Sequence, residues 1–271
     1  MPELDVNGAA LYYETSGHIS FPALLLVHAG IANLRMWDPQ VDALSQAHYV
    51  IRLDSRGFGQ TTTDDVEYSN RTDLRDLLDH LGIARATVIG SSRGGGIALD
   101  FALEHPDRVS GIVTIGSGPS GFPEVQLTPI ENERFAAMDA AWEAEDWELL
   151  PRLEVRLWSI GPTRSEADLN PSFVGTAFAL NADKPVHSEE QAVAFPLEPP
   201  AYGRLAELTV PVLVTVGDLD LSAALTQYDF LLSAVPLATG HRFADSAHLP
   251  SVERPHEFER VLLEWLSAHQ L

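Results

Sequence analysis

Short apolar runs alternate with helical patterns along this chain, and the alternation limits its fold more than any other feature of the sequence. The apolar runs cover residues 22–27, 48–53, 85–90, 109–116 and 210–217. Between them lie stretches with helical periodicity, such as residues 72–83, where leucines share one face and a glycine ends the pattern. Strands that alternate with helices predict βαβ units, and therefore a mostly parallel, twisted sheet flanked by helices, the α/β fold class.

The regular alternation of apolar runs and helical patterns is absent between residues 119 and 205. Residues 128–131 have the spacing of a capping box with proline at the first helical position, so we expect a long helix from there to Pro151. A chain of 271 residues can hold one large α/β domain with such an insertion. The sequence predicts a core domain of residues 1–118 and 206–271, with a helical insertion over residues 119–205.

The balance of charges excludes several classes of partner. The chain has 17 lysines and arginines against 39 aspartates and glutamates, a formal net charge of −22. A field of that sign repels phosphate backbones and anionic lipid headgroups, so we expect neither a nucleic acid nor a membrane surface as partner. The expected partner is a small-molecule substrate, and association into a homodimer is left open.

Three features of the sequence bear on the cellular compartment. The first residues, MPELDVNG, lack the basic region and the apolar stretch of a secretory signal. No apolar run approaches the roughly 20 residues of a membrane-spanning helix. The chain has no cysteine, which excludes disulfides, thiolate catalysis and cysteine-ligated metals. We expect a cytoplasmic protein.

Residues 90–94, GSSRG, carry the clearest chemical signal. They fit the pattern G-x-S-x-G between an apolar run and a helical segment. In that setting the chain turns so sharply at Ser92 that larger neighbours would collide, and strain of about 1 to 3 kcal/mol is typical of functional sites. The turn exposes the Ser92 hydroxyl at a helix N-terminus, which favours developing negative charge. Glycine–serine turns without a catalytic role also precede helices, so other residues must supply the rest of a site.

A catalytic serine needs a base, and the base needs an orienting acid. Asp218 and Asp220 follow the buried run 210–217, at the edge where a parallel sheet presents ligand-facing groups. His248 follows the last strand-like segment and precedes the C-terminal helical pattern, and His241 lies shortly before it. The order of serine, acid and histidine along the chain is the one that accompanies this kind of turn.

Several motifs together make the chain similar to the α/β-hydrolase family, in its form with a helical cap. The motifs are VHAG (27–30), DSRGFGQT (54–61), GSSRG (90–94), GDLD (217–220) and AHLPSVERPHEF (247–258). In that family the acid is typically the third residue after the glycine that ends the strand, which selects Asp220 over Asp218. The family's base lies a few residues before a glutamate-x-proline pair, which selects His248 over His241. The resemblance implies an α/β-hydrolase fold with Ser92, Asp220 and His248 as its catalytic triad.

The same resemblance suggests the surroundings of the triad. Residues 28–30, His-Ala-Gly, resemble the family's oxyanion loop, with alanine in place of the usual glycine. The backbone amides of Gly30 and Arg93 are the expected oxyanion donors. We expect the histidine of the motif to brace the loop without a proton-transfer role, and Asp54 to pair with Arg56 in a supporting loop.

Arg93 departs from the family, whose members often carry methionine or leucine after the nucleophile. Its side chain either binds a carboxylate of the substrate or pairs with one of the protein's own carboxylates. The large number of carboxylates in the chain favours the second alternative. Trp37 follows the oxyanion loop and is expected to border the substrate. Other aromatic residues in the insertion are expected mainly in the core, with a few lining an apolar pocket. They are Trp142, Trp147, Trp158, Phe173 and Phe178.

These residues predict acyl transfer to water. Ser92 attacks a carbonyl carbon, His248 removes the hydroxyl proton, and Asp220 holds the imidazole while two amides bind the oxyanion. No metal ion or organic cofactor is implied, and the aromatic residues suggest a small hydrophobic ester or lactone. A carbon–carbon bond hydrolase, a lyase or a perhydrolase would use the same triad, and a non-enzymatic ligand-binding protein could retain it, so these alternatives stay open.

Overall fold

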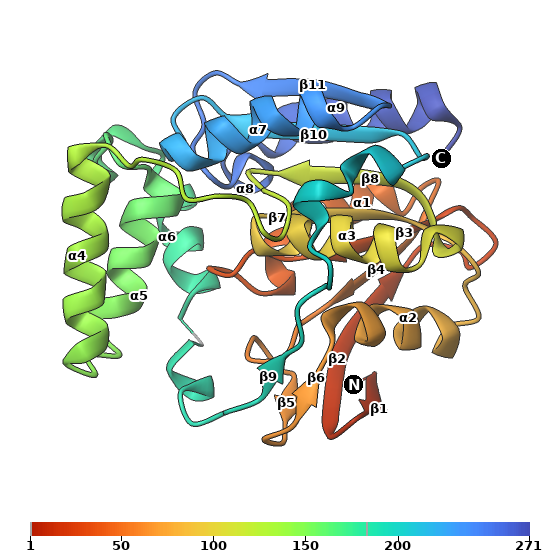
Figure 1. Ribbon diagram of the computed structural model, residues 1–271, viewed down its shortest axis with the longest axis horizontal. Helices are drawn as coiled ribbons and strands as arrows, with labels where there is room; N and C mark the ends of the chain where they lie inside the picture. Colours follow the sequence, from red (N-terminus) through yellow and green to blue (C-terminus); the bar gives the residue numbers. More distant parts are fainter. Residues whose placement is uncertain (1, 183) are drawn as a thin grey trace.

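One twisted sheet forms the centre of the molecule (Figure 1). The computed structural model describes residues 2–182 and 184–271, and within them the sheet has nine strands in the order β1-β2-β4-β3-β7-β8-β10-β11, with β5 paired to β2. The strands from β4 to β11 run parallel, whereas β1, β2 and β5 pair antiparallel. The α/β class with a mostly parallel sheet is confirmed. The bounds are β1 Glu3–Val6, β2 Ala9–Ser16, β3 Ala23–Val27, β4 Tyr49–Leu53, β5 Thr62–Thr63, β7 Ala86–Ser91, β8 Val109–Ile115, β10 Val212–Gly217 and β11 Ala238–Phe243.

Helices cover both faces of the sheet, and the strands are apolar on both sides for that reason. In β3, Leu25 and Val27 pack into one core and Leu24 and Leu26 into the other, because successive side chains of a strand point to opposite faces. The first core contains side chains of α2 (Asn70–His80), α3 (Arg93–Glu104) and α7 (Ser222–Ala234). The second core contains side chains of α1 (Asp38–Leu44), α8 (Pro250–Glu253) and α9 (Pro255–His269).

None of the helices in the described ranges is both long and apolar enough to cross a bilayer.

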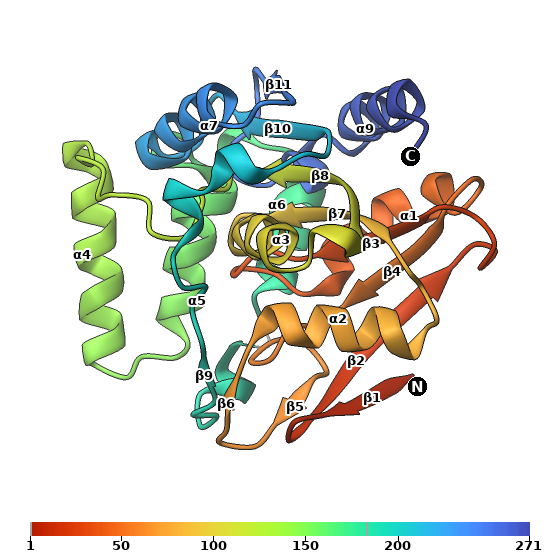
Figure 2. The same ribbon diagram turned by 45° about the vertical axis from the view of Figure 1, so that its right-hand side comes forward.

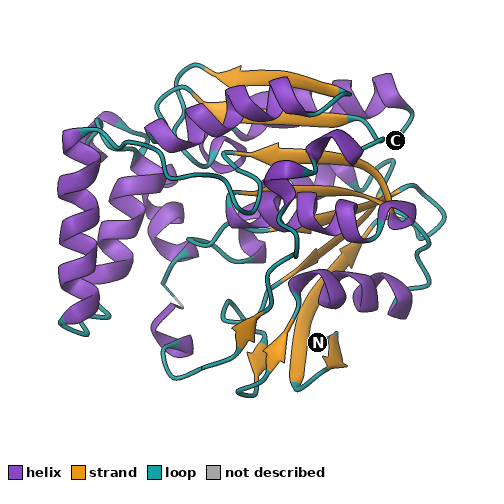
Figure 3. Ribbon diagram, viewed as in Figure 1, coloured by secondary structure: helices purple, strands orange, loops and turns teal. Residues whose placement is uncertain are grey.

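Between β8 and β10 the chain leaves the sheet and forms helices beside the carboxyl ends of the parallel strands (Figure 3). These are α4 (Pro129–Glu143), α5 (Leu149–Glu154), the π-helix η3 (Val155–Ile160) and α6 (Pro171–Leu180). The capping box is present, formed by Thr128 and Glu131. The single helix expected to run as far as Pro151 is wrong, because Glu145 adopts a φ of 53°, which ends α4, and a new helix begins at Leu149.

The residues from 119 to 205, called the helical segment below, pack directly on the core. Phe173 and Ala177 of α6 share an apolar cluster with Leu249, which follows His248 in the chain. A smaller cluster joins α4 and α5 to Leu221, the residue after Asp220. Past α6 the chain returns along the sheet (Figure 2), where β9 (Val193–Ala194) pairs with β6 (Glu67–Tyr68). The division into a core domain and an inserted domain at residues 119 and 205 stays a prediction.

Candidate active site

Ser92 lies at the sharp turn between β7 and α3. Its backbone has φ 52° and ψ −118°, a region that residues other than glycine rarely occupy. The Ser92 amide donates to the carbonyl of Ile115 at the end of β8, at 2.7 Å. Gly94 permits the helix to begin there, because a Cβ on residue 94 would lie 2.3 Å from the Val27 carbonyl oxygen at the end of β3. The spacing of the motif therefore reflects a turn packed tightly between two strand ends.

Asp220 and His248 form a buried pair. Nδ1 of His248 lies 2.8 Å from Oδ2 and 2.9 Å from Oδ1 of Asp220, and the two side chains are 6% and 0% exposed. Oδ1 also accepts the amide of Leu221 at 2.7 Å, which fixes the carboxylate. Because a carboxylate only accepts, His248 donates its Nδ1 proton, and in the neutral ring this leaves Nε2 as the unprotonated nitrogen that a general base requires.

Gly116, directly after β8, lies against this pair. Its φ is +56°, and a Cβ at this position would lie 2.9 Å from Asp220 Oδ2 and 3.0 Å from His248 Nδ1. A side chain here would therefore push into the hydrogen bond between acid and base. Sequence reasoning missed this residue, although the glycine that ends the apolar run 109–116 was its signal.

The two rival candidates have other contacts. Asp218 is 35% exposed and accepts from Arg242 Nε at 2.5 Å, as expected for a solvated carboxylate. His241 packs edge-on against Phe243, with ring centres 4.6 Å apart.

Within the described residues, no three His, Asp or Glu side chains are placed so that they could hold a metal ion.

The two amides expected to bind an oxyanion have no acceptor in the described part of the chain. Neither the Gly30 nor the Arg93 amide donates a hydrogen bond to another protein group there. The Ala29 amide faces the Met36 sulfur, at 3.4 Å. Gly30 and Arg93 belong to adjacent segments, because a Cβ on residue 30 would lie 3.8 Å from the Cβ of Arg93. This arrangement suits Gly30 and Arg93 as the pair of donors.

His28 braces the loop that carries Gly30. Its Nδ1 donates to the Ala29 carbonyl at 2.8 Å, and its Nε2 accepts the Ser55 amide at 3.0 Å. Burial lowers the pKa of His28 to about 3, so the ring stays neutral at physiological pH. Since both ring nitrogens are engaged in the protein, His28 has the bracing role expected for it.

The structure gives Arg56 a different partner from the expected Asp54. Arg56 forms a two-pronged ion pair with Asp73 of α2, with Nε–Oδ2 and Nη2–Oδ1 distances of 2.9 Å. Asp54 instead accepts the backbone amides of Leu34 and Gln60, at 2.8 and 2.9 Å. The short Asp54 side chain satisfies two loop amides, while the longer Arg56 reaches a buried carboxylate that would otherwise be costly.

Trp37 packs away from the predicted triad. It ends the short helix η1 (Leu34–Trp37), is 1% exposed, and lies against Phe258 of α9 with ring centres 6.5 Å apart. This position corrects the expectation that Trp37 borders the substrate. The helix η1 turns the indole onto the second core, so its role is packing.

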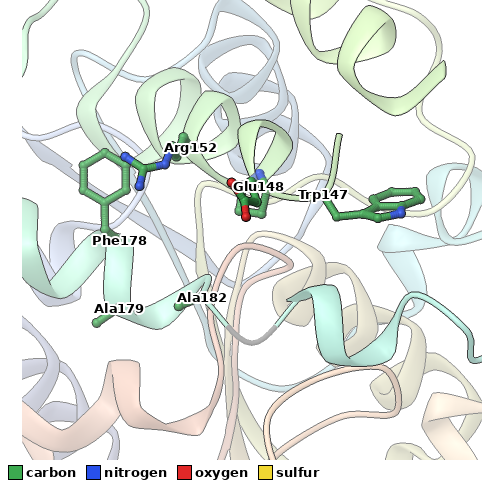
Figure 4. A pocket seen from close by; sticks show the side chains of 7 residues that line it. Trp147, Glu148, Arg152, Phe178, Ala179 and Ala182 are labelled. Atoms are coloured by element: carbon green, nitrogen blue, oxygen red, sulfur yellow. The ribbon is translucent and has the colours of Figure 1, made fainter. Parts of the chain in front are cut away.

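The aromatic residues of the helical segment divide between core, surface and a cavity. Phe173 is buried and Trp142 is exposed. Trp147 and Phe178 line a cavity of about 610 Å³ at the ends of α5 and α6. Figure 4 shows Arg152 reaching toward the Phe178 ring, with Glu148 between Arg152 and Trp147. The described residues that line it include no member of the predicted triad.

Glu131 ties the helical segment to the loop of the predicted acid. Its Oε2 accepts the Thr128 amide and the Ser222 hydroxyl, both at 2.7 Å, and its Oε1 accepts the Ser222 amide at 2.6 Å. One carboxylate therefore caps both α4 and α7. Ser222 is two residues after Asp220, so this contact fixes the start of α7 next to the acid.

A second contact ties the helical segment to the loop of the predicted base. Arg164 Nη1 lies 2.6 Å from Oε1 of Glu253, whose Oε2 accepts the Ser246 hydroxyl at 2.9 Å and the Ala247 amide at 3.1 Å. The His248 amide itself donates to the Trp158 carbonyl of η3, at 3.3 Å. The sequence did not predict the contact of Glu131 with Ser222 or that of Arg164 with Glu253. Each joins residues about ninety positions apart and leaves no periodic signal.

Glu131→Ala is expected to lower the free energy of unfolding at neutral pH by about 1 to 3 kcal/mol, because two helix starts lose their cap. Burial raises the pKa of Glu131, but the hydrogen bonds from Ser222 and Thr128 outweigh it and hold the pKa below its usual value. Its stabilising effect is therefore complete above the unfolded-state pKa of about 4.3 and is lost as the pH falls through the lower folded value. Denaturant unfolding of wild type and variant at a series of pH values measures this difference.

The matched control is Glu133→Ala, which removes an exposed carboxylate from the same helix. It is expected to change stability by no more than about 0.5 kcal/mol. A Glu131→Ala difference that stays constant down to pH 3, or one no larger than that of the control, would show that the carboxylate does not cap the two helices.

Comparison with known proteins agrees with this geometry. The chain matches the family described as the alpha/beta hydrolase fold over residues 22–255. It is 30% identical to the 2-hydroxy-6-oxononadienedioate/2-hydroxy-6-oxononatrienedioate hydrolase of Burkholderia vietnamiensis, covering 90% of this chain and 86% of that one. It is 25% identical to 3-oxoadipate enol-lactonase 2 of Acinetobacter baylyi, covering 96% and 94%. The solved enol-lactonase from Burkholderia xenovorans superposes with a TM-score of 0.74 at 27% identity, over 98% of this chain and all of its own. The sheet, the sharp turn and a match over most of the length show that this chain belongs to the α/β-hydrolase fold family and is a hydrolase enzyme.

Proposed function

We propose that the enzyme is a serine hydrolase that cleaves a small, largely apolar carboxylic ester or lactone through an acyl intermediate on Ser92. The observation that carries the proposal is the buried hydrogen bond between His248 Nδ1 and Asp220. The neighbourhood of Ser92 supports it as the third member: its amide bonds to Ile115 at the end of β8, and the next residue, Gly116, abuts the pair.

The reaction proceeds in two acyl-transfer steps. The Ser92 oxygen attacks the carbonyl carbon as His248 Nε2 takes its proton, and Asp220 stabilises the imidazolium that forms. The amides of Gly30 and Arg93 bind the oxyanion of the tetrahedral intermediate. Collapse of that intermediate expels the alcohol, which takes the proton from His248. A water molecule, deprotonated by His248, then attacks the acyl carbon and releases the acid and the free Ser92 hydroxyl.

The relatives support the ester or lactone bond as the substrate class. The Acinetobacter baylyi and Burkholderia xenovorans proteins are enol-lactonases by name, and each match covers nearly the full length of both chains. A lactone is a cyclic ester, so its hydrolysis needs the same nucleophile, base and oxyanion donors as that of an open ester. The leaving alcohol of a lactone stays attached to the acyl group, so the two substrate types differ in product and not in mechanism.

Carbon–carbon bond hydrolysis is the second candidate reaction. It is supported by the relative of 30% identity, whose name describes a hydrolase of an oxo-dienedioate. The same three residues can serve that reaction, since the fold hosts several chemistries. Product analysis of a panel that contains esters, lactones and vinylogous diketones distinguishes the two, because only the second reaction breaks a bond between carbons.

A fluorophosphonate is expected to label the enzyme on Ser92 alone, because only that serine combines an activated oxygen with oxyanion donors for the phosphoryl group. Mass spectrometry of the digested protein locates the adduct. Ser91→Ala is the matched control, since the Ser91 hydroxyl is buried in β7 without a hydrogen-bond partner among the described residues. The control should label as wild type does. An adduct on another serine, or a folded enzyme that does not label, would overturn the proposed nucleophile.

A further inference from the structure

A positive charge without a carboxylate partner lies next to the proposed nucleophile. The guanidinium carbon of Arg93 is 5.0 Å from the centre of the Phe58 ring, and Nη2 donates to Asn70 Oδ1 at 3.0 Å. Asn70 is neutral, and no carboxylate within the described ranges forms an ion pair with Arg93. The expectation that Arg93 pairs with one of the protein's own carboxylates is therefore wrong.

Two guanidinium groups, those of Arg56 and Arg93, lie near a single carboxylate. That carboxylate is Asp73, and Arg56 already binds both of its oxygens. Burial lowers the pKa of Arg93, and the attraction and hydrogen bonding of Tyr68, together with the attraction of Asp73, only partly offset it. Among the described atoms, Nη1 of Arg93 is buried and has no hydrogen-bond partner. The cluster therefore has one net positive charge and one buried N–H donor without a partner, which is unfavourable unless an anion completes it.

We propose that Arg93 binds a carboxylate on the acyl chain of the substrate, so that the ester or lactone cleaved at Ser92 is an anion. The inference rests on the proposed function, because that function places the substrate carbonyl at Ser92. Because Arg93 directly follows Ser92 in the chain, we expect only a few carbons between the substrate's carboxylate and its reacting carbonyl.

The chemistry of the cluster favours a carboxylate over other anions. A carboxylate is planar and accepts parallel N–H bonds from a guanidinium, and its single charge balances the excess charge of the cluster. A phosphate group carries nearly two negative charges at neutral pH and would overcompensate it. The net charge of −22 repels anions from the protein as a whole. A local cation beside the nucleophile is therefore what an anionic substrate needs to bind here.

Paired phenyl esters test the proposal. One series contains the monophenyl esters of succinic, glutaric and adipic acid, and the matched neutral series contains phenyl butanoate, pentanoate and hexanoate. The quantity measured is the ratio of kcat/KM for the anionic ester to that for its neutral counterpart, which cancels any general loss of activity. In Arg93→Met this ratio is expected to fall about ten- to a hundredfold for the preferred chain length. Arg93→Lys keeps the charge without the planar fork and should give an intermediate ratio.

Arg156→Met is the matched control. It removes the same charge from a side chain that is 48% exposed and pairs with Glu166, so the ratio should not change. Should Arg93→Met fail to fold, inhibition of the wild-type enzyme by glutarate and by glutaramide decides, with competition by glutarate alone expected.

The possible results distinguish a failure of the carboxylate site from a failure of the proposed serine hydrolase activity. A wild-type enzyme that cleaves the neutral esters, together with an unchanged ratio in Arg93→Met, overturns the carboxylate site and leaves the serine hydrolase intact. Equal inhibition by glutarate and glutaramide has the same meaning. Absence of turnover for every ester and lactone, with no fluorophosphonate adduct, overturns the proposed function itself.

Discussion

Ser92→Ala is expected to lower kcat for ester hydrolysis by at least about 10⁴-fold, to the level that oxyanion binding alone supports. The hydroxyl supplies the nucleophile, and alanine offers no substitute for it. The fold should persist, because the Ser92 amide and not its side chain makes the contact to Ile115 at the end of β8. Alanine also accepts the strained backbone of this turn about as well as serine does.

The measurement is steady-state hydrolysis of a p-nitrophenyl ester, with circular dichroism and a thermal unfolding curve for each variant. Ser91→Ala provides the neighbouring control and should retain most of the wild-type activity. A Ser92→Ala enzyme with more than about a tenth of the wild-type kcat would exclude Ser92 as the nucleophile.

Asp220→Asn is expected to lower kcat/KM by about 10³- to 10⁴-fold, whereas Asp218→Asn changes it by less than about threefold. Asp220 is fully buried and accepts the Nδ1 proton of His248. An amide in its place can offer its own N–H to the ring, which favours the tautomer with a proton on Nε2 and so removes the base. Asp218 is partly exposed, and its contact is an ion pair with Arg242.

Two results would contradict that assignment. Equal losses in the two variants would mean that the family spacing after the strand does not identify the acid in this chain. A large loss in Asp218→Asn alone would give the role to the exposed carboxylate, and the pair formed by Asp220 and His248 would then be structural.

The strands and the contact between Asp220 and His248 could be predicted because each leaves a local signal. A strand buried on both faces is a continuous apolar run, as in residues 210–217, so its position is visible without any knowledge of its neighbours. The turn at Ser92 needs small residues at fixed offsets, and the loops after β10 and β11 carry their acid and histidine at spacings shared with a family. Hence the sheet and the meeting of Asp220 with His248 were accessible from the sequence.

The errors arose where a contact depends on the tertiary fold. Arg56 has a carboxylate two residues away, but Asp54 already accepts two loop amides, and the fold places the buried Asp73 within reach of the guanidinium. Trp37 follows the oxyanion loop in sequence, but η1 rotates its ring onto α9. The break of α4 near Glu145 lies in a stretch of good helix formers, where propensity alone gives no reason to stop.

The contacts of Glu131 and Arg164 have a consequence for exchanging parts among hydrolases of this fold. Both residues belong to the helical segment, and their partners Ser222 and Glu253 lie in α7 and α8, the helices that follow the predicted acid and base in the chain. A chimera whose new segment lacks counterparts of Glu131 and Arg164 would lose both contacts at once, and we expect the residues around the predicted acid and base to be held less firmly even though the predicted triad is still present. We therefore expect an exchange of the helical segment to succeed only together with the residues that its contacts require in α7 and α8.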